Sequence, residues 1–160
     1  IRTMENSYHM DFWKALKANP TPMTFSEVYI GLQQKTIDAQ ENPYEVIVSS
    51  KLYEQQDYVV ETNHLPHYIS LIVSDEFYKD LPKDQQKIIS EAAETAKEYA
   101  RKASDERIED RMKVIKDSGT KIVRLDKKTQ EDVRKASSDI YKSIEENVSK
   151  DVFDAYLNQK

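Results

Sequence analysis

The chain has 160 residues and a net charge of −5, with acidic and basic side chains interspersed along its length. This length is enough for one domain with a core, and 38% hydrophobic against 33% charged residues is typical of an ordered rather than a disordered chain. The charge argues against nucleic acid as a partner, since phosphates are neutralised by a basic face. No run of ~18 apolar residues is present that would span a membrane.

The first twenty residues predict a short strand over 1–4 and then a helix over 7–17, because large apolar residues recur at helical spacing. These residues are Tyr8, Phe12, Trp13 and Leu16. The chain starts in Ile-Arg-Thr rather than at a methionine, so we expect a fragment or a cloned domain of a longer protein. Cysteine is absent, which excludes disulfides and thiolate metal sites.

The stretch 20–43 has the most distinctive pattern in the chain. Pro20 and Pro22 hold the backbone extended, and Ser26 is placed to cap a short helix. The apolar face of this helix consists of Val28, Tyr29 and Leu32. The polar residues that follow before the next proline are Asp38, Gln40, Glu41 and Asn42. From the residues alone, this polar loop either presents hydrogen-bonding groups to a ligand or simply faces water.

The middle of the chain alternates helical and strand patterns. The segment 44–53 predicts a helix through its middle, where its apolar residues cluster. The β-branched runs 57–62 and 68–74 predict two strands. A short helix is expected to begin at Ser74 and to end at Leu81, just before a proline.

The segment 83–117 contains neither proline nor glycine. Alanine and isoleucine mark a narrow apolar stripe along it, so it predicts one helix of ~50 Å. Its charged residues predict a solvated face with ion pairs between successive turns. A helix of this length either crosses between two lobes or is broken near Ser104. Gly119 is placed to end it.

The last forty residues predict a strand over 120–125, a helix over 127–147 and a final helix that contains Val152 and Leu157. No internal repeat and no linker-like composition separates these elements. Helices that alternate with short strands favour an α/β sandwich with a mixed sheet.

Several motifs occur in one order along the chain. They are Pro20-x-Pro22-Met23-x-Phe25-Ser26-Glu27-Val28-Tyr29, Asp38-x-Gln40-Glu41-Asn42-Pro43, Tyr53-Glu54 and Thr62-Asn63-His64. With them the chain, from Ile1 to about Gly119, resembles the second half of a DctP-type solute-binding protein of a TRAP (tripartite ATP-independent periplasmic) transporter. Lys17 and Ala39 stand where that family usually has glycine.

The resemblance implies an α/β fold, namely the C-terminal lobe of a two-lobe periplasmic-binding-protein-like fold with a mixed sheet and one long connecting helix. It divides the chain into a ligand-binding segment of the second lobe (1–82), the connecting helix (83–117) and a C-terminal strand and helices that pack back on the lobes (118–160).

The resemblance also implies a function. The protein would bind a small organic acid in the periplasm or at the outer face of the membrane, either free or lipid-anchored, without itself spanning the membrane. It would then deliver the solute to the permease subunits of a TRAP transporter. No bond is made or broken in such a process, so neither enzyme activity nor a cofactor is expected.

Arg2 and Asn42 are the main candidates for ligand binding. A guanidinium offers two parallel donors that match the two oxygens of a carboxylate. The family carries its carboxylate-gripping arginine in an Ile-Arg or Leu-Arg strand, so the resemblance implies that Arg2 is the anion anchor. Asn42 combines a donor and an acceptor in one amide, and it either faces the ligand, as the resemblance implies, or forms an Asx turn before Pro43.

The resemblance assigns three further residues to the site. Phe25 would form an apolar wall of the cleft, although most isolated phenylalanines belong to a core. His64 would reach the ligand or an ordered water, although a histidine at the end of a strand is most often structural. Asn6 lies just beyond Arg2, where family members place a polar ligand contact. Glu41 and Gln40 are expected to hold the loop in place.

Other functions have little support in the residues. His64 and His67 point to different faces of a strand and turn, so no metal site is predicted. Two glycines are too few for a phosphate-binding loop, and no serine lies in a nucleophile elbow. An enzyme with Glu41 or His64 as a base lacks a second group. The alternative that stays open is a helical protein-interaction module in which 83–117 docks a partner.

Overall fold

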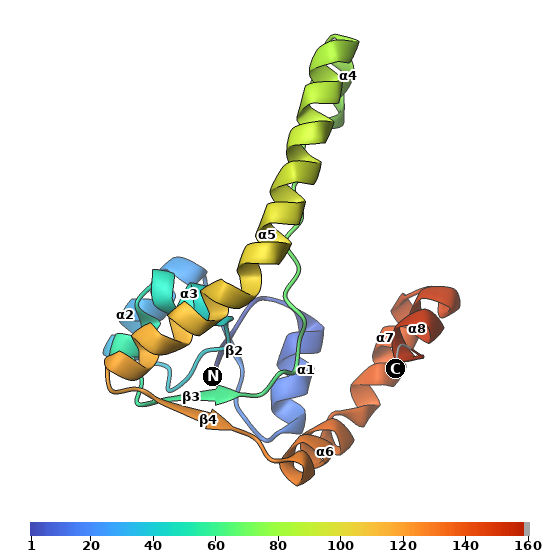
Figure 1. The fold of residues 1–160 in the computed structure, drawn as a ribbon. Coiled ribbons are helices and arrows are strands. Elements are labelled where there is room, and N and C mark those ends of the chain that lie inside the picture. The colour runs from blue at the N-terminus through green and yellow to red at the C-terminus, as the bar shows by residue number, and fades with distance from the viewer. Residues whose placement is uncertain (159–160) are drawn as a thin grey trace.

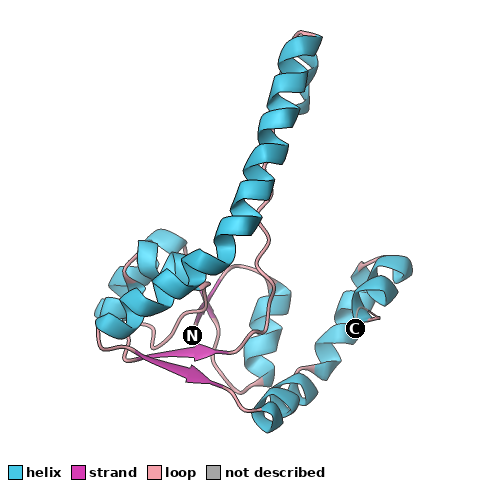
Figure 2. Ribbon diagram, in the orientation of Figure 1, coloured by secondary structure: helices cyan, strands magenta, loops and turns pink. Residues whose placement is uncertain are grey.

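The structure is a computed structural model that describes residues 1–158, apart from the side chain of residue 105. Helices dominate it, with two small pairs of strands (Figures 1 and 2). The helices are α1 (Ser7–Ala15), α2 (Val28–Gln33), α3 (Tyr44–Ser49), α4 (Asp75–Asp80), α5 (Lys83–Asp117), α6 (Lys127–Ala136), α7 (Ser138–Asn147) and α8 (Lys150–Leu157). The strands are β1 (Arg2–Thr3), β2 (Thr21–Pro22), β3 (Tyr58–Glu61) and β4 (Lys121–Arg124), and the 3₁₀ helices are η1 (Phe25–Glu27) and η2 (Leu52–Gln55).

Both pairs of strands run parallel. β1 lies beside β2 with Arg2 opposite Thr21, and Arg2 also forms a parallel bridge with Gln40. β3 lies beside β4 with Tyr58 opposite Lys121. Each pair joins segments that are distant in the sequence, because parallel strands need a crossover connection between them. The predicted α/β class is therefore confirmed, but the described strands form two small parallel pairs rather than one mixed sheet.

The hydrophobic core lies where the C-terminal part of α5 packs on α3, next to α2 and η2. Its buried residues are Val28, Leu32, Ile37, Ile47, Leu52 and Ile115. The buried hydroxyl of Thr120 lies 3.1 Å from the carbonyl oxygens of Tyr53 and of Gln56, which ties the start of β4 to the end of η2. The chain before α5 and the chain after it are thus joined around the end of this helix.

α5 confirms the prediction of one long helix over 83–117. It ends through Gly119, whose φ of 96° lies in the left-handed region that favours glycine. Figure 1 shows the helix bending where its yellow part meets its orange part, so that the half before the bend projects away from the core together with α4. Despite its length α5 is not apolar enough to cross a membrane, and the same holds for the other helices among residues 1–158.

The segment 68–74 forms no strand, so this prediction from its β-branched sequence is wrong. A strand needs a neighbouring backbone to pair with, and the two strand pairs of the described chain lie elsewhere. The apolar side chains of the segment are largely exposed, with 84% of Ile69 and 91% of Ile72 accessible. A β-branched sequence therefore forms no strand where no neighbouring strand is available to pair with it.

Two helix boundaries also differ from the predictions. Ser26 lies inside η1 rather than capping a helix, and Thr24 is the residue that precedes η1. The helix predicted over 127–147 is divided into α6 and α7 at Ser137. The buried hydroxyl of Ser137 donates to the carbonyl of Val133 at 3.0 Å, and such back-bonding is known to bend helices.

An ion pair joins α3 to α5 beside the core. Nε of Arg111 donates to Oε2 of Glu45 at 2.9 Å, and this hydrogen bond holds the pKa of the Glu45 carboxyl below its usual range. The pKa of Glu45 is lower in the folded than in the unfolded protein, so the ion pair stabilises the fold fully above the usual carboxyl pKa. It is lost as the pH falls through the lowered value.

We expect Glu45→Gln to lower the melting temperature at neutral pH by about 2 °C or less, because solvent screens this partly exposed pair. Circular dichroism melts at neutral pH and at a pH below the lowered pKa of Glu45 measure this effect. The difference between variant and wild type should vanish at the acid pH and in molar salt. A difference that persists at the acid pH would assign the stabilisation to packing rather than to charge.

Candidate ligand-binding site

Arg2 is buried at the start of the chain, with 4% of its surface accessible. Its Nε and Nη2 both donate to the carbonyl oxygen of Met23, at 2.9 and 2.8 Å, and its backbone N–H donates to the carbonyl of Ala39 at 2.7 Å. A guanidinium has five N–H donors, so the Met23 carbonyl occupies one edge and leaves the outer edge, with Nη1, for another acceptor. Burial lowers the pKa of Arg2 and the charge of Glu41 opposes this, but a guanidinium stays charged.

Phe25 lies against this guanidinium. Cζ of Arg2 is 5.8 Å from the centre of the Phe25 ring, within range of a cation–π contact. The ring belongs to η1 and has 45% of its surface accessible, so it is not a core residue. An exposed aromatic face beside a buried positive charge suits a ligand that has both an anionic group and an apolar part.

The polar loop lies beside β1, where the backbone of Gln40 pairs with that of Arg2. Arg2 and Gln40 are ladder partners, and residues that face each other across a ladder project to the same face. Nδ2 of Asn42 donates to Oε1 of Gln40 at 2.6 Å, and Nε2 of Gln40 donates to Oε1 of Gln56 at 3.1 Å. Asn42 is therefore held by a side-chain amide two residues before it, rather than free in solvent.

His64 is packed among aromatic side chains. Its ring stacks on Phe12 with centroids 4.9 Å apart and meets Trp13 edge-on at 5.2 Å. Its Nδ1 lies 2.7 Å from the hydroxyl of Thr62, and its Nε2 lies 3.6 Å from Oε2 of Glu41. This environment is that of a structural histidine that ties the loop after β3 to α1 and to the polar loop.

Glu41 is bracketed by two histidines, which sequence reasoning missed. Nδ1 of His9 lies 3.6 Å from one of its carboxylate oxygens, and Nε2 of His64 lies 3.6 Å from the other. All three side chains are largely buried. The prediction that Glu41 holds the loop agrees with this geometry, but its partners come from α1 and from the chain after β3, which no local pattern indicates.

Asn6 caps α1. Its Oδ1 accepts the backbone N–H of His9 at 3.2 Å, and its backbone is extended, as expected at this position. The residue is exposed, and its Nδ2 lies at the far side of the amide from the capping bond. The capping role uses the acceptor of the side chain and leaves the donor for another partner.

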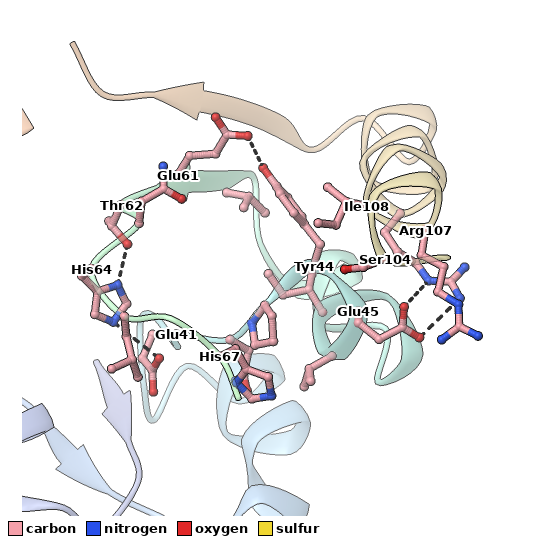
Figure 3. Close-up of a pocket in the computed structure, with 18 of the residues that line it drawn as sticks. Glu41, Tyr44, Glu45, Glu61, Thr62, His64, His67, Ser104, Arg107 and Ile108 are labelled. Carbon is pink, nitrogen blue, oxygen red and sulfur yellow. Dashed lines mark hydrogen bonds and ion pairs between the residues drawn. The ribbon is translucent and has the colours of Figure 1, made fainter. Parts of the chain in front are cut away.

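A cavity of about 810 Å³ lies between the chain after β3 and α5 (Figure 3). Asn42 and His64 are among its lining residues, and on the α5 side Ser104 and Arg107 line it. Tyr44 and Glu61 also line the cavity, and the Tyr44 hydroxyl donates a hydrogen bond to Oε1 of Glu61 at 2.7 Å. Burial raises the pKa of Tyr44, and the bond to Glu61 adds to this.

The five expected site residues are thus not all in one cavity. Asn42 and His64 line the cavity, whereas Arg2, Phe25 and Asn6 lie outside it. Arg2, Phe25 and the polar loop are joined instead by the β1 ladder and the ring contact. Sequence reasoning also missed Arg107 and Arg111, which line the cavity although α5 was expected to present a solvated charged face.

The groups gathered beside β1 are suited to the recognition of an anion. A buried guanidinium with a free edge, an exposed ring and a positioned amide can bind a carboxylate. Among residues 1–158, no three histidine, aspartate or glutamate side chains are grouped so as to hold a metal ion.

A comparison with family profiles identifies the family. Residues 1–147 match DctP, described as "Bacterial extracellular solute-binding protein, family 7", and the chain belongs to this family. The match extends beyond Gly119, where the resemblance of the motifs was expected to fade. The family is one of solute-binding proteins, which favours this class over the helical interaction module.

Relatives and solved structures agree with this family. The chain is 34% identical over 136 residues to the 2,3-diketo-L-gulonate-binding periplasmic protein YiaO of Escherichia coli, which covers 82% of this chain and 40% of YiaO. A TRAP periplasmic solute-binding protein of Polaromonas bound to D-erythronate superposes with a TM-score of 0.88 at 33% identity, over 96% of this chain and 50% of that one. A protein of the same kind from Shewanella oneidensis with bound succinate has a TM-score of 0.86 at 30% identity, over 96% and 51%.

The chain therefore spans about half the length of the solved structures it matches, and less of the curated relatives. These structures have the two-lobe binding-protein fold, and this chain matches a part of it.

Proposed function

We propose that the protein binds a small carboxylate-containing solute outside the cytoplasm and passes it to the membrane subunits of a TRAP transporter. The observation that carries this proposal is the buried Arg2 guanidinium, which keeps its outer edge unused beside the Phe25 ring. The similar proteins named above support it. One is named for binding diketogulonate, and the other two hold erythronate and succinate, and all three molecules carry a carboxylate. The protein makes and breaks no bond in this function.

In this proposal each site residue has a separate role. The outer edge of Arg2 forms two parallel hydrogen bonds with the carboxylate, and Phe25 covers the carbon chain beside it. Asn42 bonds a further polar group of the ligand. Asn6 contributes the donor of its amide, and His64 acts through ordered water or through the loop, since its ring is stacked on aromatic side chains.

The chain divides by role in the same way. Residues 1–82 carry the ligand contacts of this lobe, and 83–117 form the helix that connects the two lobes. Residues 118–160 return to pack on the lobes. The exposed apolar run at 68–74 and the first half of α5 support this division, since both extend away from the hydrophobic core in the same direction. Ligand bound between the lobes would close them, and the closed form would be the one that the permease recognises.

Thermal unfolding of the full-length protein with a panel of acids tests this function. Succinate, malate, D-erythronate and galactonate are the probes, and uncharged erythritol is the control. An acid that binds the folded protein raises its free energy of unfolding by about 2.7 kcal/mol when the acid concentration is a hundred times the Kd. We expect at least one acid to do so, and Asn42→Ala and Phe25→Ala to reduce the gain. A folded protein that no acid stabilises would overturn the proposal.

A further inference from the structure

Glu61 is the last residue of β3, and both oxygens of its carboxylate are paired. Oε1 accepts a hydrogen bond from the hydroxyl of Tyr44, the first residue of α3, at 2.7 Å (Figure 3). Oε2 lies 2.8 Å from Nε of Arg124, which stands opposite Glu61 in the register of β3 and β4. The Glu61 side chain is only 16% exposed. The end of β3 is therefore tied by side chains both to α3 and to β4.

The chain loses such contacts soon after Glu61. His64, whose ring stacks on α1, is the last residue before a run, from Leu65 to Phe77, in which every residue is exposed. The cavity of about 810 Å³ lies between the start of this run and α5. In Figure 1 the run extends from the end of β3 to α4, away from the core. This run and α5 itself are thus the two connections between the core and the projecting part, which consists of α4 and the first half of α5.

The hydroxyl of Tyr44 is the stronger of the two ties to Glu61. Tyr44 packs against the core, and burial raises its pKa, so the hydroxyl remains a donor at neutral pH. Its bond to a carboxylate is charge-assisted and thus stronger than a bond between neutral groups. Arg124 is 74% exposed, so solvent screens its ion pair with Glu61. Without the Tyr44 hydroxyl, one oxygen of a largely buried carboxylate would lack a donor, and the end of β3 would lose its link to α3.

We propose that Tyr44 and Glu61 are positioning residues for the closure of the two lobes, because they fix the direction in which the chain after β3 leaves this lobe. This inference rests on the proposed function, since it concerns the movement that the function requires. Neither residue acts by touching the solute. When the connection is loosely held, the ligand-free protein samples a wider range of lobe arrangements, and closure about the solute then costs more conformational entropy.

Distances between two spin labels in the full-length protein test the inference. One label is placed at Gln34→Cys, at the end of α2, and the other at Asp80→Cys, at the end of α4; both positions are exposed. This chain has no cysteine, so these are its only labelling sites. Tyr44→Phe removes only the hydroxyl, and we expect it to broaden the distribution of distances without ligand. It should also raise the Kd of an acid that binds the wild type by about three- to tenfold, the range of one hydrogen bond.

Tyr29→Phe is the matched control. Tyr29 also packs against the core, and its hydroxyl donates to Oε2 of Glu54 at 2.8 Å, but this bond joins α2 to η2 rather than holding the end of β3. This variant should keep the wild-type distances and Kd. Glu61→Ala should have an effect at least as large as that of Tyr44→Phe. Adding Tyr44→Phe to Glu61→Ala should change nothing further, since the hydroxyl then has no carboxylate to bond.

The outcomes distinguish the positioning role from the proposed function. If acids bind but Tyr44→Phe leaves the distances or the Kd as in the wild type, the positioning role is overturned and the solute-binding function stands. The same holds if Tyr29→Phe broadens the distances as much as Tyr44→Phe, or if the effects of Tyr44→Phe and Glu61→Ala add in full. If no acid binds the folded wild type, the proposed function is overturned, and the role in closure is overturned with it.

Discussion

Arg2→Ala should weaken binding of the acid at least about 100-fold, since two charge-assisted hydrogen bonds to one carboxylate contribute about 3 kcal/mol together. The guanidinium is buried and already oriented by the Met23 carbonyl, so the ligand gains these bonds without ordering a flexible side chain. Calorimetric titration with an acid that binds the wild type measures the loss. The binding of that acid should become too weak to detect at micromolar protein.

Arg2→Lys is the informative comparison. Lysine keeps the charge, but a single ammonium cannot bond the Met23 carbonyl and both carboxylate oxygens in one plane. We expect it to lose at least about tenfold in affinity. Both variants also leave the Met23 carbonyl less well satisfied, so their unfolding must be measured beside their binding. A folded Arg2→Ala protein that binds the acid as well as the wild type would remove Arg2 from the site.

Leu52→Ala should destabilise the chain by about 2–5 kcal/mol, the usual cost of truncating a fully buried leucine. Leu52 is 1% exposed, and it packs with Ile115 and Ile47 where α5 meets α3 and η2. Removing its side chain leaves a cavity at the point that joins the segments before and after α5. Urea unfolding followed by circular dichroism measures the change in the free energy of unfolding.

Leu71→Ala is the matched control in the same 160-residue chain. It removes the same atoms from a side chain that is 72% exposed, so its effect should stay within about 0.5 kcal/mol. Equal losses in both variants would contradict the assignment of the core to the region around Leu52. A larger loss for Leu71→Ala in the full-length protein than in this chain would indicate that the other lobe of the full-length protein covers 68–74.

The local elements follow closely from the sequence. α1 begins at Ser7 as predicted, and α4 begins after Ser74, whose hydroxyl accepts the backbone N–H of Phe77. α5 has both predicted ends, one after Pro82 and the other before Gly119. Periodicity, caps and proline act within a few residues, so the sequence displays them directly.

The site followed from the sequence only in part. The family resemblance indicated Arg2, Asn42, Phe25, His64 and Asn6 as candidates. Of the groups that hold them, only Gln40 and Glu41 were expected. Gln56 is the clearest example of the others, since it lies outside every motif and reaches Asn42 only through Gln40. The stacking of His64 on Phe12 was likewise hidden, because 52 positions separate the two residues.

The sequence by itself determined most of the helices, both ends of α5, the α/β class and, through its motifs, the family. Only the tertiary structure decided that 68–74 has no strand to pair with. It also decided that one edge of the Arg2 guanidinium donates to the Met23 carbonyl and that Glu41 lies between two histidines. Helix-forming forces act between residues at most one turn or so apart, whereas strand pairing and side-chain contacts depend on which distant backbone the chain path brings alongside. That path is a property of the whole fold, and no local pattern contains it.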